Sequence, residues 1–237
     1  MWQRFGVDRL RHFPYLALAV AACAGGPPPS LAPTGAGPIS RERVQAFVDS
    51  TQPGGHRLSR FKWSFKDERS STGGRGSARV AGPDSMRIDI AGPLGVGRAA
   101  AFVLGDSEVW VDPEKSVKDM VPNYPLLWAM FAVAMGPSDS DALNGLIDSQ
   151  QVFVQYANGA DTVEYLWQAH ASPARFYAVV RHAGKLVGRV ETRLDAEGHL
   201  ASSRLTVPRR PARLDLNFYL NTDQGDFPPD TWRRREP

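Results

Sequence analysis

Cysteine is almost absent from this chain of 237 residues, since Cys23 is the only one. A single cysteine excludes a disulfide within the chain, so a folded domain must be stabilised by its packed core. Long hydrophobic runs are lacking as well. The N-terminal apolar run covers only residues 13–22, whereas a helix that crosses a membrane needs about 20 apolar residues.

The N-terminal run has the layout of a secretory signal peptide. Arg4, Arg9 and Arg11 precede the apolar residues, and small residues follow them. A basic region, a short apolar region and a small-residue cleavage site are typical of export signals. We therefore expect the chain to be exported.

The residues around the cysteine resemble the bacterial lipobox, because Val20, Ala21 and Ala22 come directly before Cys23. The resemblance implies that a signal peptidase recognises these three residues and cuts before Cys23, whose sulfur and new amino group are then acylated. Two or three acyl chains hold a protein on a membrane effectively for good, at about 0.8 kcal/mol per buried methylene. The alternative is ordinary cleavage near Ala22 or Ala24, which leaves a free thiol.

Composition divides the chain into three parts. Residues 1–22 are the expected lipoprotein signal peptide, and residues 23–38 are the lipidated cysteine and a tether rich in Gly and Pro. Residues 39–237 have the length of one ordinary domain. The formal net charge is only +3, and we expect no nucleic-acid partner. The basic cluster 233–235 is compatible with contact to anionic lipid or with a solvated tail.

Most of the domain has the period-two pattern of β-strands. Phe61, Trp63 and Phe65 alternate with polar residues, and Met86, Ile88 and Ile90 do the same. Turn signals separate about eleven candidate strands, five before residue 115 and six after residue 150. The pattern predicts a mainly β (α+β) fold with an antiparallel sheet that is buried on one face. A short helix with Ser40 as N-cap is predicted to open the domain.

One segment is typical of a helix that is buried on all sides. Leu126–Met135 is apolar at every position, with Pro125 near its start and Gly136-Pro137 after it. Such a helix needs apolar partners on more than one side. The sheet can be one partner. The other is either a second protein layer, such as a helix from Ser140-Asp141 toward Ile147, or a bound apolar ligand for which the segment is a lid.

A curved sheet that does not close leaves an apolar hollow beneath such a lid. The candidate cavity and lid residues are Phe61, Trp63, Phe65, Met86, Ile88, Ile90, Trp128, Phe131, Met135 and Trp167.

The strand that ends in Gly92-Pro93-Leu94-Gly95, the return strand after it and the strand that ends in Asp112-Pro113 resemble the LolA/LolB-like outer-membrane lipoprotein family. The resemblance implies an incomplete antiparallel barrel of eleven strands with a helical lid, whose cavity receives lipoprotein acyl chains or other lipid. It also implies a periplasmic carrier protein as partner and a monomer anchored by lipid to the outer membrane, facing the periplasm. Gly92, Pro93, Leu94 and Gly95 would form a membrane-insertion loop with Leu94 exposed.

No pattern for catalysis, a metal or a cofactor stands out. The residues 92–97 precede another strand rather than the helix that a dinucleotide-binding loop opens. Asp139-Ser140-Asp141 begins like a calcium loop but places Leu143 where a third ligand belongs. The histidines are scattered, and no Gly-x-Ser-x-Gly elbow is present. We expect a protein that is not an enzyme, either a lipid or lipoprotein carrier or a structural lipoprotein that holds a protein partner.

Overall fold

The computed structural model describes residues 30–82, 84–93, 98–104, 108–112, 120–209 and 211–233. The expected signal peptide, Cys23 and the loop residues Leu94 and Gly95 lie outside the described residues. Pro93 is exposed and Gly92 is half-buried at the start of that loop.

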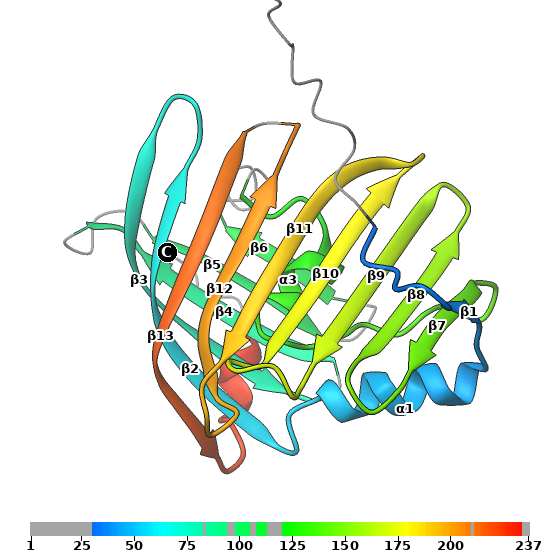
Figure 1. Cartoon of the computed structure of the whole chain (residues 1–237). Coiled ribbons are helices and arrows are strands. Elements are labelled where there is room, and N and C mark those ends of the chain that lie inside the picture. Colours follow the sequence, from blue (N-terminus) through cyan, green and yellow to red (C-terminus); the bar gives the residue numbers. More distant parts are fainter. Residues whose placement is uncertain are drawn as a thin grey trace, which may run out of the picture.

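One antiparallel sheet of thirteen strands dominates the described part of the chain (Figure 1). Its strand order is β1-β7-β8-β9-β10-β11-β12-β13-β2-β3-β4-β5-β6. The strands are β1 (Gly37–Pro38), β2 (His56–Lys66), β3 (Ser71–Ala81), β4 (Ser85–Ala91), β5 (Arg98–Leu104), β6 (Glu108–Asp112), β7 (Ala142–Ile147), β8 (Val152–Asn158), β9 (Asp161–Gln168), β10 (Arg175–His182), β11 (Lys185–Leu194), β12 (Leu200–Val207) and β13 (Ala212–Gln224). The helices are α1 (Arg41–Thr51), α3 (Tyr124–Ala129) and the 3-10 helix η2 (Pro229–Trp232).

The sheet is two meanders joined by the long pair β13–β2. This pair runs from Arg213 opposite Lys66 to Gln224 opposite His56, with an irregularity between Phe218 and Leu220. The end strands β1 and β6 do not pair with each other in the described part, so the sheet curves without closing. The fold class is therefore the mainly β, incomplete barrel that the sequence predicts.

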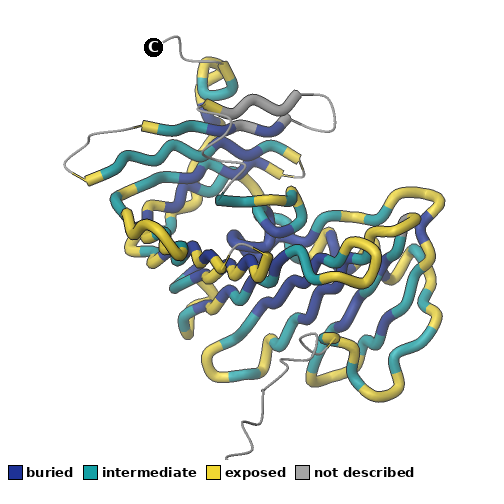
Figure 2. Tube along the Cα trace, turned by 90° about the horizontal axis from the view of Figure 1, so that it is seen from above, coloured by how far each residue is buried: buried dark blue, intermediate teal, exposed yellow. Residues whose placement is uncertain are grey.

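The concave face of the sheet carries the core. Phe61 and Trp63 of β2 lie opposite Phe218 and Leu216 of β13, and all four side chains belong to or pack on one apolar cluster. Edge-to-face contacts join the Phe61, Phe131 and Phe218 rings, whose centroids lie 5.6 to 6.2 Å apart. In Figure 2 the buried residues gather in the middle parts of the strands, and the turns at the strand ends are mostly exposed. The alternation in the sequence thus predicts the buried face correctly.

Residues 120–135, here called the cover segment, cross the concave face (Figure 1). The helix predicted over Leu126–Met135 is wrong in extent, because α3 ends at Ala129 and residues 133–136 have no regular structure. Ala132 has a φ of 58°, a value that does not continue a right-handed helix. The prediction that this segment is buried on several sides is correct, since Leu126, Trp128 and the residues 129–134 are all buried.

The helix predicted from Ser140-Asp141 toward Ile147 is also wrong. Asp141 accepts hydrogen bonds from the backbone N–H and the hydroxyl of Ser138, so it closes a turn before β7. β7 pairs with β8 and with the two-residue strand β1. These two strands account for the difference between the eleven predicted strands and the thirteen described.

The segment before β1 lies on the outer face of the sheet. Ser30 Oγ and the backbone N–H of Leu31 donate to the carboxylate of the buried Glu164, at 2.9 and 2.8 Å. Leu31 and Ala36 pack on an apolar cluster of β8, β9 and β10. The last part of the expected tether, residues 30–38, therefore contacts the domain.

Gly188 of β11 makes room for the cover segment. A Cβ atom there would lie 2.6 Å from Leu126 Cδ1, well inside van der Waals contact. Added bulk in a packed core forces shifts that cost about 1–3 kcal/mol. We expect Gly188→Val to lower the free energy of unfolding by this amount in urea denaturation. Gly225→Ala is the control, because nothing lies within 4 Å of its added Cβ, and an equal loss in both variants would contradict this role.

Candidate functional site

An apolar cavity of about 60 Å³ lies between the cover segment and the concave face. Strands β2, β4, β5 and β13 form one wall, and the cover segment forms the other. The lining residues are Phe61, Trp63, Ile88, Ile90, Ala99, Ala100, Ala101, Met120, Val121, Leu127, Met130, Phe131, Leu214 and Leu216. Every one of these side chains is apolar, so the cavity suits hydrocarbon and offers no partner to a buried polar group.

Half of the predicted cavity residues line this cavity: Phe61, Trp63, Ile88, Ile90 and Phe131. The other five lie elsewhere in the core. Met86 is buried and Phe65 packs on the core cluster. The rings of Trp167 and Phe176 have their centroids 5.8 Å apart. The structure therefore brings together the predicted aromatics of β2 and the isoleucines of β4.

Trp128 and Met135 line a separate hollow of about 230 Å³ beside α1. Trp128 Nε1 and Gln52 Oε1 are buried there without a hydrogen-bond partner in the described part of the chain. Trp128 and Met135, both candidates for the cavity or its lid, thus belong to the cover segment without lining the apolar cavity.

Buried polar side chains of the sheet hold the backbone of the cover segment. Thr192 Oγ1 on β11 donates to the carbonyl of Ala129 at 2.8 Å. Arg57 on β2 donates to the carbonyl of Phe131 at 2.9 Å. Burial lowers the pKa of Arg57, and the nearby Asp223 carboxylate opposes this effect. The Thr192 hydroxyl adds to the backbone bond that the Ala129 carbonyl accepts from the Ala132 N–H, and Arg57 supplies a partner to the Phe131 carbonyl beyond the end of α3.

The C-terminal part of the cover segment is held by two further hydroxyls. Tyr165 of β9 accepts a hydrogen bond from the backbone N–H of Met135 at 3.1 Å. Thr51 of α1 accepts one from the N–H of Ala134 at 2.9 Å. Tyr156 also hydrogen-bonds to the Tyr165 hydroxyl. In this state the cover segment is fixed to both halves of the sheet.

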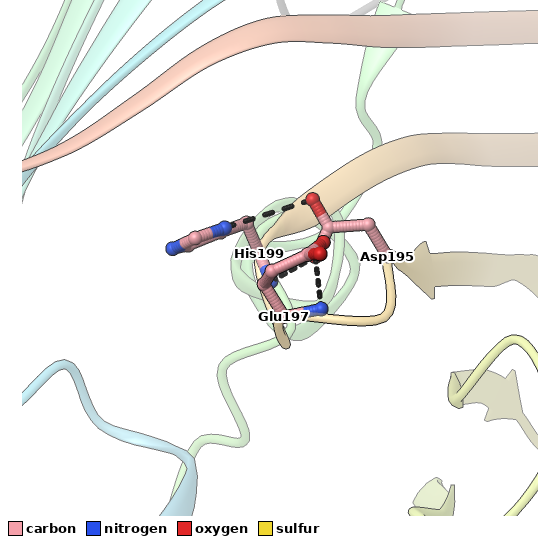
Figure 3. Close-up of side chains that lie close together, drawn as sticks. All are labelled: Asp195, Glu197 and His199. Atoms are coloured by element: carbon pink, nitrogen blue, oxygen red, sulfur yellow. Dashed lines mark hydrogen bonds and ion pairs between the residues drawn. The ribbon is translucent and has the colours of Figure 1, made fainter.

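Asp195, Glu197 and His199 bring three possible metal ligands within 4.8 Å of one another at the turn between β11 and β12 (Figure 3). Asp195 Oδ1 already accepts the backbone N–H groups of Glu197 and His199, at 3.1 and 2.8 Å. Glu197 and His199 are exposed. Closing the hairpin accounts for this arrangement, and the spacing along the chain did not single it out.

In the described residues, no helix has the length and apolar character needed to cross a membrane.

Tyr165 gives the attachment of the cover segment a measurable dependence on pH. Burial raises the pKa of Tyr165 to about 12, whereas an unfolded tyrosine titrates near about 10. The folded state thus favours the neutral phenol of Tyr165. The resulting contribution to the free energy of unfolding is complete below a pH of about 10 and is lost as the pH rises through about 12. Tyr156 has a raised pKa for the same reason.

We expect Tyr165→Phe to cost about 1–3 kcal/mol near neutral pH, because the Met135 N–H loses its acceptor. Above pH of about 10, the free energy of unfolding should fall less steeply in this variant than in the parent chain. Urea denaturation over the pH range tests both effects. The exposed Tyr219 provides the control variant Tyr219→Phe, and identical pH profiles for Tyr165→Phe and the parent would refute the assignment.

Comparison with known proteins identifies the fold. No family model matches the sequence, and no curated protein is similar to it in sequence. Among solved structures, a domain assigned to outer membrane lipoprotein sorting from Vibrio parahaemolyticus is similar, with a TM-score of 0.54 and 11% identity over 81% of this chain and 97% of that one. A LolA superfamily protein from Nitrosomonas europaea has a TM-score of 0.54 and 9% identity, covering 83% and 98%.

A DUF1329 family protein from Desulfovibrio piger is also similar, with a TM-score of 0.51 and 9% identity over 81% of this chain and 95% of that one. These identities are too low to transfer an activity, but the coverage includes nearly the whole of each relative. The chain therefore has the LolA-like fold, which is the fold that the sequence resemblance implies.

Proposed function

We propose that this protein is a lipid-anchored lipoprotein of the bacterial cell envelope that binds acyl chains beneath the cover segment. It receives lipoproteins from a periplasmic carrier protein, or inserts them, at the outer membrane. The wholly apolar cavity between Phe61, Trp63 and the cover segment is the observation that carries this proposal. The similarity to a domain assigned to lipoprotein sorting supports it.

Acyl binding on this surface requires no catalytic group. Each methylene that leaves water contributes about 0.8 kcal/mol, so on the order of ten buried methylenes correspond to micromolar affinity, about 8 kcal/mol, before the entropic cost of association. We accordingly propose a carrier without enzymatic activity, cofactor or metal, acting as a monomer. Its cargo is the acyl chain of a lipoprotein or of another lipid.

The cavity is small in the described state. A single water needs about 10–15 Å³, so about 60 Å³ admits only a few methylene-sized groups. A full acyl chain therefore requires the cover segment to move away from β2, β4 and β5. Leu127, Met130 and Phe131 are the side chains that such a movement would withdraw from the cavity wall.

The proposed lipid anchor and the proposed membrane-insertion loop rest on the amino-acid sequence. Cys23, preceded by Val20, Ala21 and Ala22, would carry the acyl chains that confine the domain to the membrane. The loop Gly92–Gly95 follows β4 at the end of the strands that line the cavity. Leu94 in that loop would contact the bilayer during insertion.

A structural lipoprotein that binds a protein partner is the second candidate. The small cavity and the five side-chain hydrogen bonds that hold residues 129–135, the fifth from Gln52 to the Ala134 carbonyl, favour it. The two candidates differ in one property, since only a carrier binds free acyl chains in a saturable manner.

Ala101→Trp tests the cavity directly. Ala101 lines the cavity from β5, so an indole there would fill the available space. We expect the parent chain with Cys23→Ser to bind a fluorescent long-chain fatty acid saturably, and Ala101→Trp to weaken binding at least about tenfold, the equivalent of about 1.4 kcal/mol. Ala160→Trp, in the exposed turn between β8 and β9, is the control. Absence of saturable binding to the parent chain would rule out the carrier.

Leu94→Glu tests insertion separately from binding. A carboxylate at the loop opposes entry into hydrocarbon, because burying an unpaired charge is costly. We expect normal fatty-acid binding but reduced transfer of an acylated peptide to liposomes. Ser149→Glu places the same charge in the exposed turn between β7 and β8 as a control. Transfer at the parent rate by Leu94→Glu would disprove the role of the loop.

A further inference from the structure

A row of basic residues crosses the outer face of β2, β3, β4 and β5. Lys62 lies opposite Arg75, Arg75 lies opposite Ala91, and Ala91 lies opposite Arg98. Residues directly opposite each other project from the same face of a sheet. This is the face away from the cavity, because Phe61 and Ile90, the neighbours of Lys62 and Ala91, line the cavity. We call Lys62, Arg75 and Arg98 the basic row.

Repulsion between the like charges of the basic row destabilises the sheet when no anion is bound. Adjacent strands are about 4.8 Å apart, so Lys62 and Arg75 are like charges at neighbouring positions, an arrangement that destabilises a sheet. Arg75 and Arg98 are two strands apart, with only the small side chain of Ala91 between them. The methyl group of Ala91 leaves a space that both guanidinium groups can reach.

No anionic side chain compensates the basic row. Lys62, Arg75 and Arg98 have neither an ion pair nor a side-chain hydrogen bond with any described residue, and all three are exposed. Asp89, the nearest carboxylate along β4, is already bound by Arg79 at 2.9 Å and by Arg87 at 3.0 Å.

The same outer face is neutralised elsewhere. Arg204 and Arg213 both contact the carboxylate of Asp215, at 2.6 and 2.7 Å. Arg193 contacts Glu191 at 2.9 Å. These arginines of β11–β13 thus have carboxylate partners, whereas Lys62, Arg75 and Arg98 have none among the described residues.

A groove of about 790 Å³ contains the two arginines of the row. Its lining residues are Arg60, Arg75, Gly76, Ser77, Arg87, Asp89, Ile90, Ala91, Arg98, Ala99, Ala100, Asp112 and Tyr219. Arg60 adds a further cation without a described partner, and Asp112 is the one carboxylate of the lining that no described cation contacts. Five of the lining residues are small, namely Gly76, Ser77, Ala91, Ala99 and Ala100, and Tyr219 is exposed.

We infer that this groove binds the phosphate of an anionic phospholipid headgroup. Guanidinium groups bind phosphate through paired, charge-assisted hydrogen bonds. Exposed tyrosine side chains such as Tyr219 are typical of protein surfaces at the membrane interface. Ile90, Ala99 and Ala100 line both this groove and the apolar cavity. The headgroup site therefore lies beside the acyl site, but it can be occupied whether or not the acyl site is.

Vesicle flotation tests the inference with the whole chain as secreted by a bacterial host and carrying Cys23→Ser. Vesicles of phosphatidylcholine alone are compared with vesicles that also contain phosphatidylglycerol. We expect binding only to the anionic vesicles, with weakening at high salt. Each basic residue near an anionic surface contributes about fivefold. The triple variant Arg60→Gln, Arg75→Gln, Arg98→Gln, which removes the three exposed cations of the groove, should therefore lose on the order of 100-fold in binding.

The matched control removes three exposed basic residues elsewhere, with Arg43→Gln, Lys185→Gln and Arg209→Gln. An equal loss in this control would overturn the site in favour of general charge attraction. Calorimetric binding of inorganic phosphate without a preference for anionic vesicles would also overturn it, in favour of a soluble phosphate ligand. Fatty-acid binding by the triple variant should equal that of the parent, which separates a failure here from a failure of the acyl site.

Discussion

The structure depends on covering the concave face of a sheet that does not close. The end strands β1 and β6 stay apart, so water would reach Phe61, Trp63, Leu214 and Leu216 without a cover. The cover segment removes this surface from water, and the hydrophobic effect drives its docking. Since the segment leaves regular helix at Ala129, its backbone groups must find partners on the sheet.

The sequence predicts the strands well and the cover segment poorly, for one physical reason. Period-two alternation arises only when one face of a strand is buried, so Phe61–Phe65 and Met86–Ile90 are unambiguous. Leu126–Met135 is apolar throughout and has no period, so helix and buried irregular chain look alike. The helix predicted from Ser140-Asp141 is wrong for a different reason. An acidic residue that closes a turn with Ser138 has the same sequence pattern as a helix N-cap.

The cavity could be predicted only through its large side chains. Phe61, Ile88 and Phe131 stand out in the sequence, whereas the space itself depends on Ala99–Ala101 of β5. Three consecutive alanines give no alternation, so they do not show which of them faces inward. Trp128 shows the converse, since its size suggests a residue that lines the apolar cavity, although it lines the hollow beside α1 instead.

Strands β2–β5 present two chemistries on opposite faces, and Ala91 lies where these faces meet. Its side chain lies in the basic row, while its carbonyl accepts a hydrogen bond from the Trp63 indole of the cavity wall at 3.1 Å. Gly74 permits this contact, because a Cβ there would overlap the Ala91 carbonyl. The indole bond is additional to the ladder, because Ala91 is also paired with Arg75 on β3 and with Arg98 on β5. An amphiphile has the same division, with hydrocarbon and anionic group joined at one point, and the two faces of these strands match it.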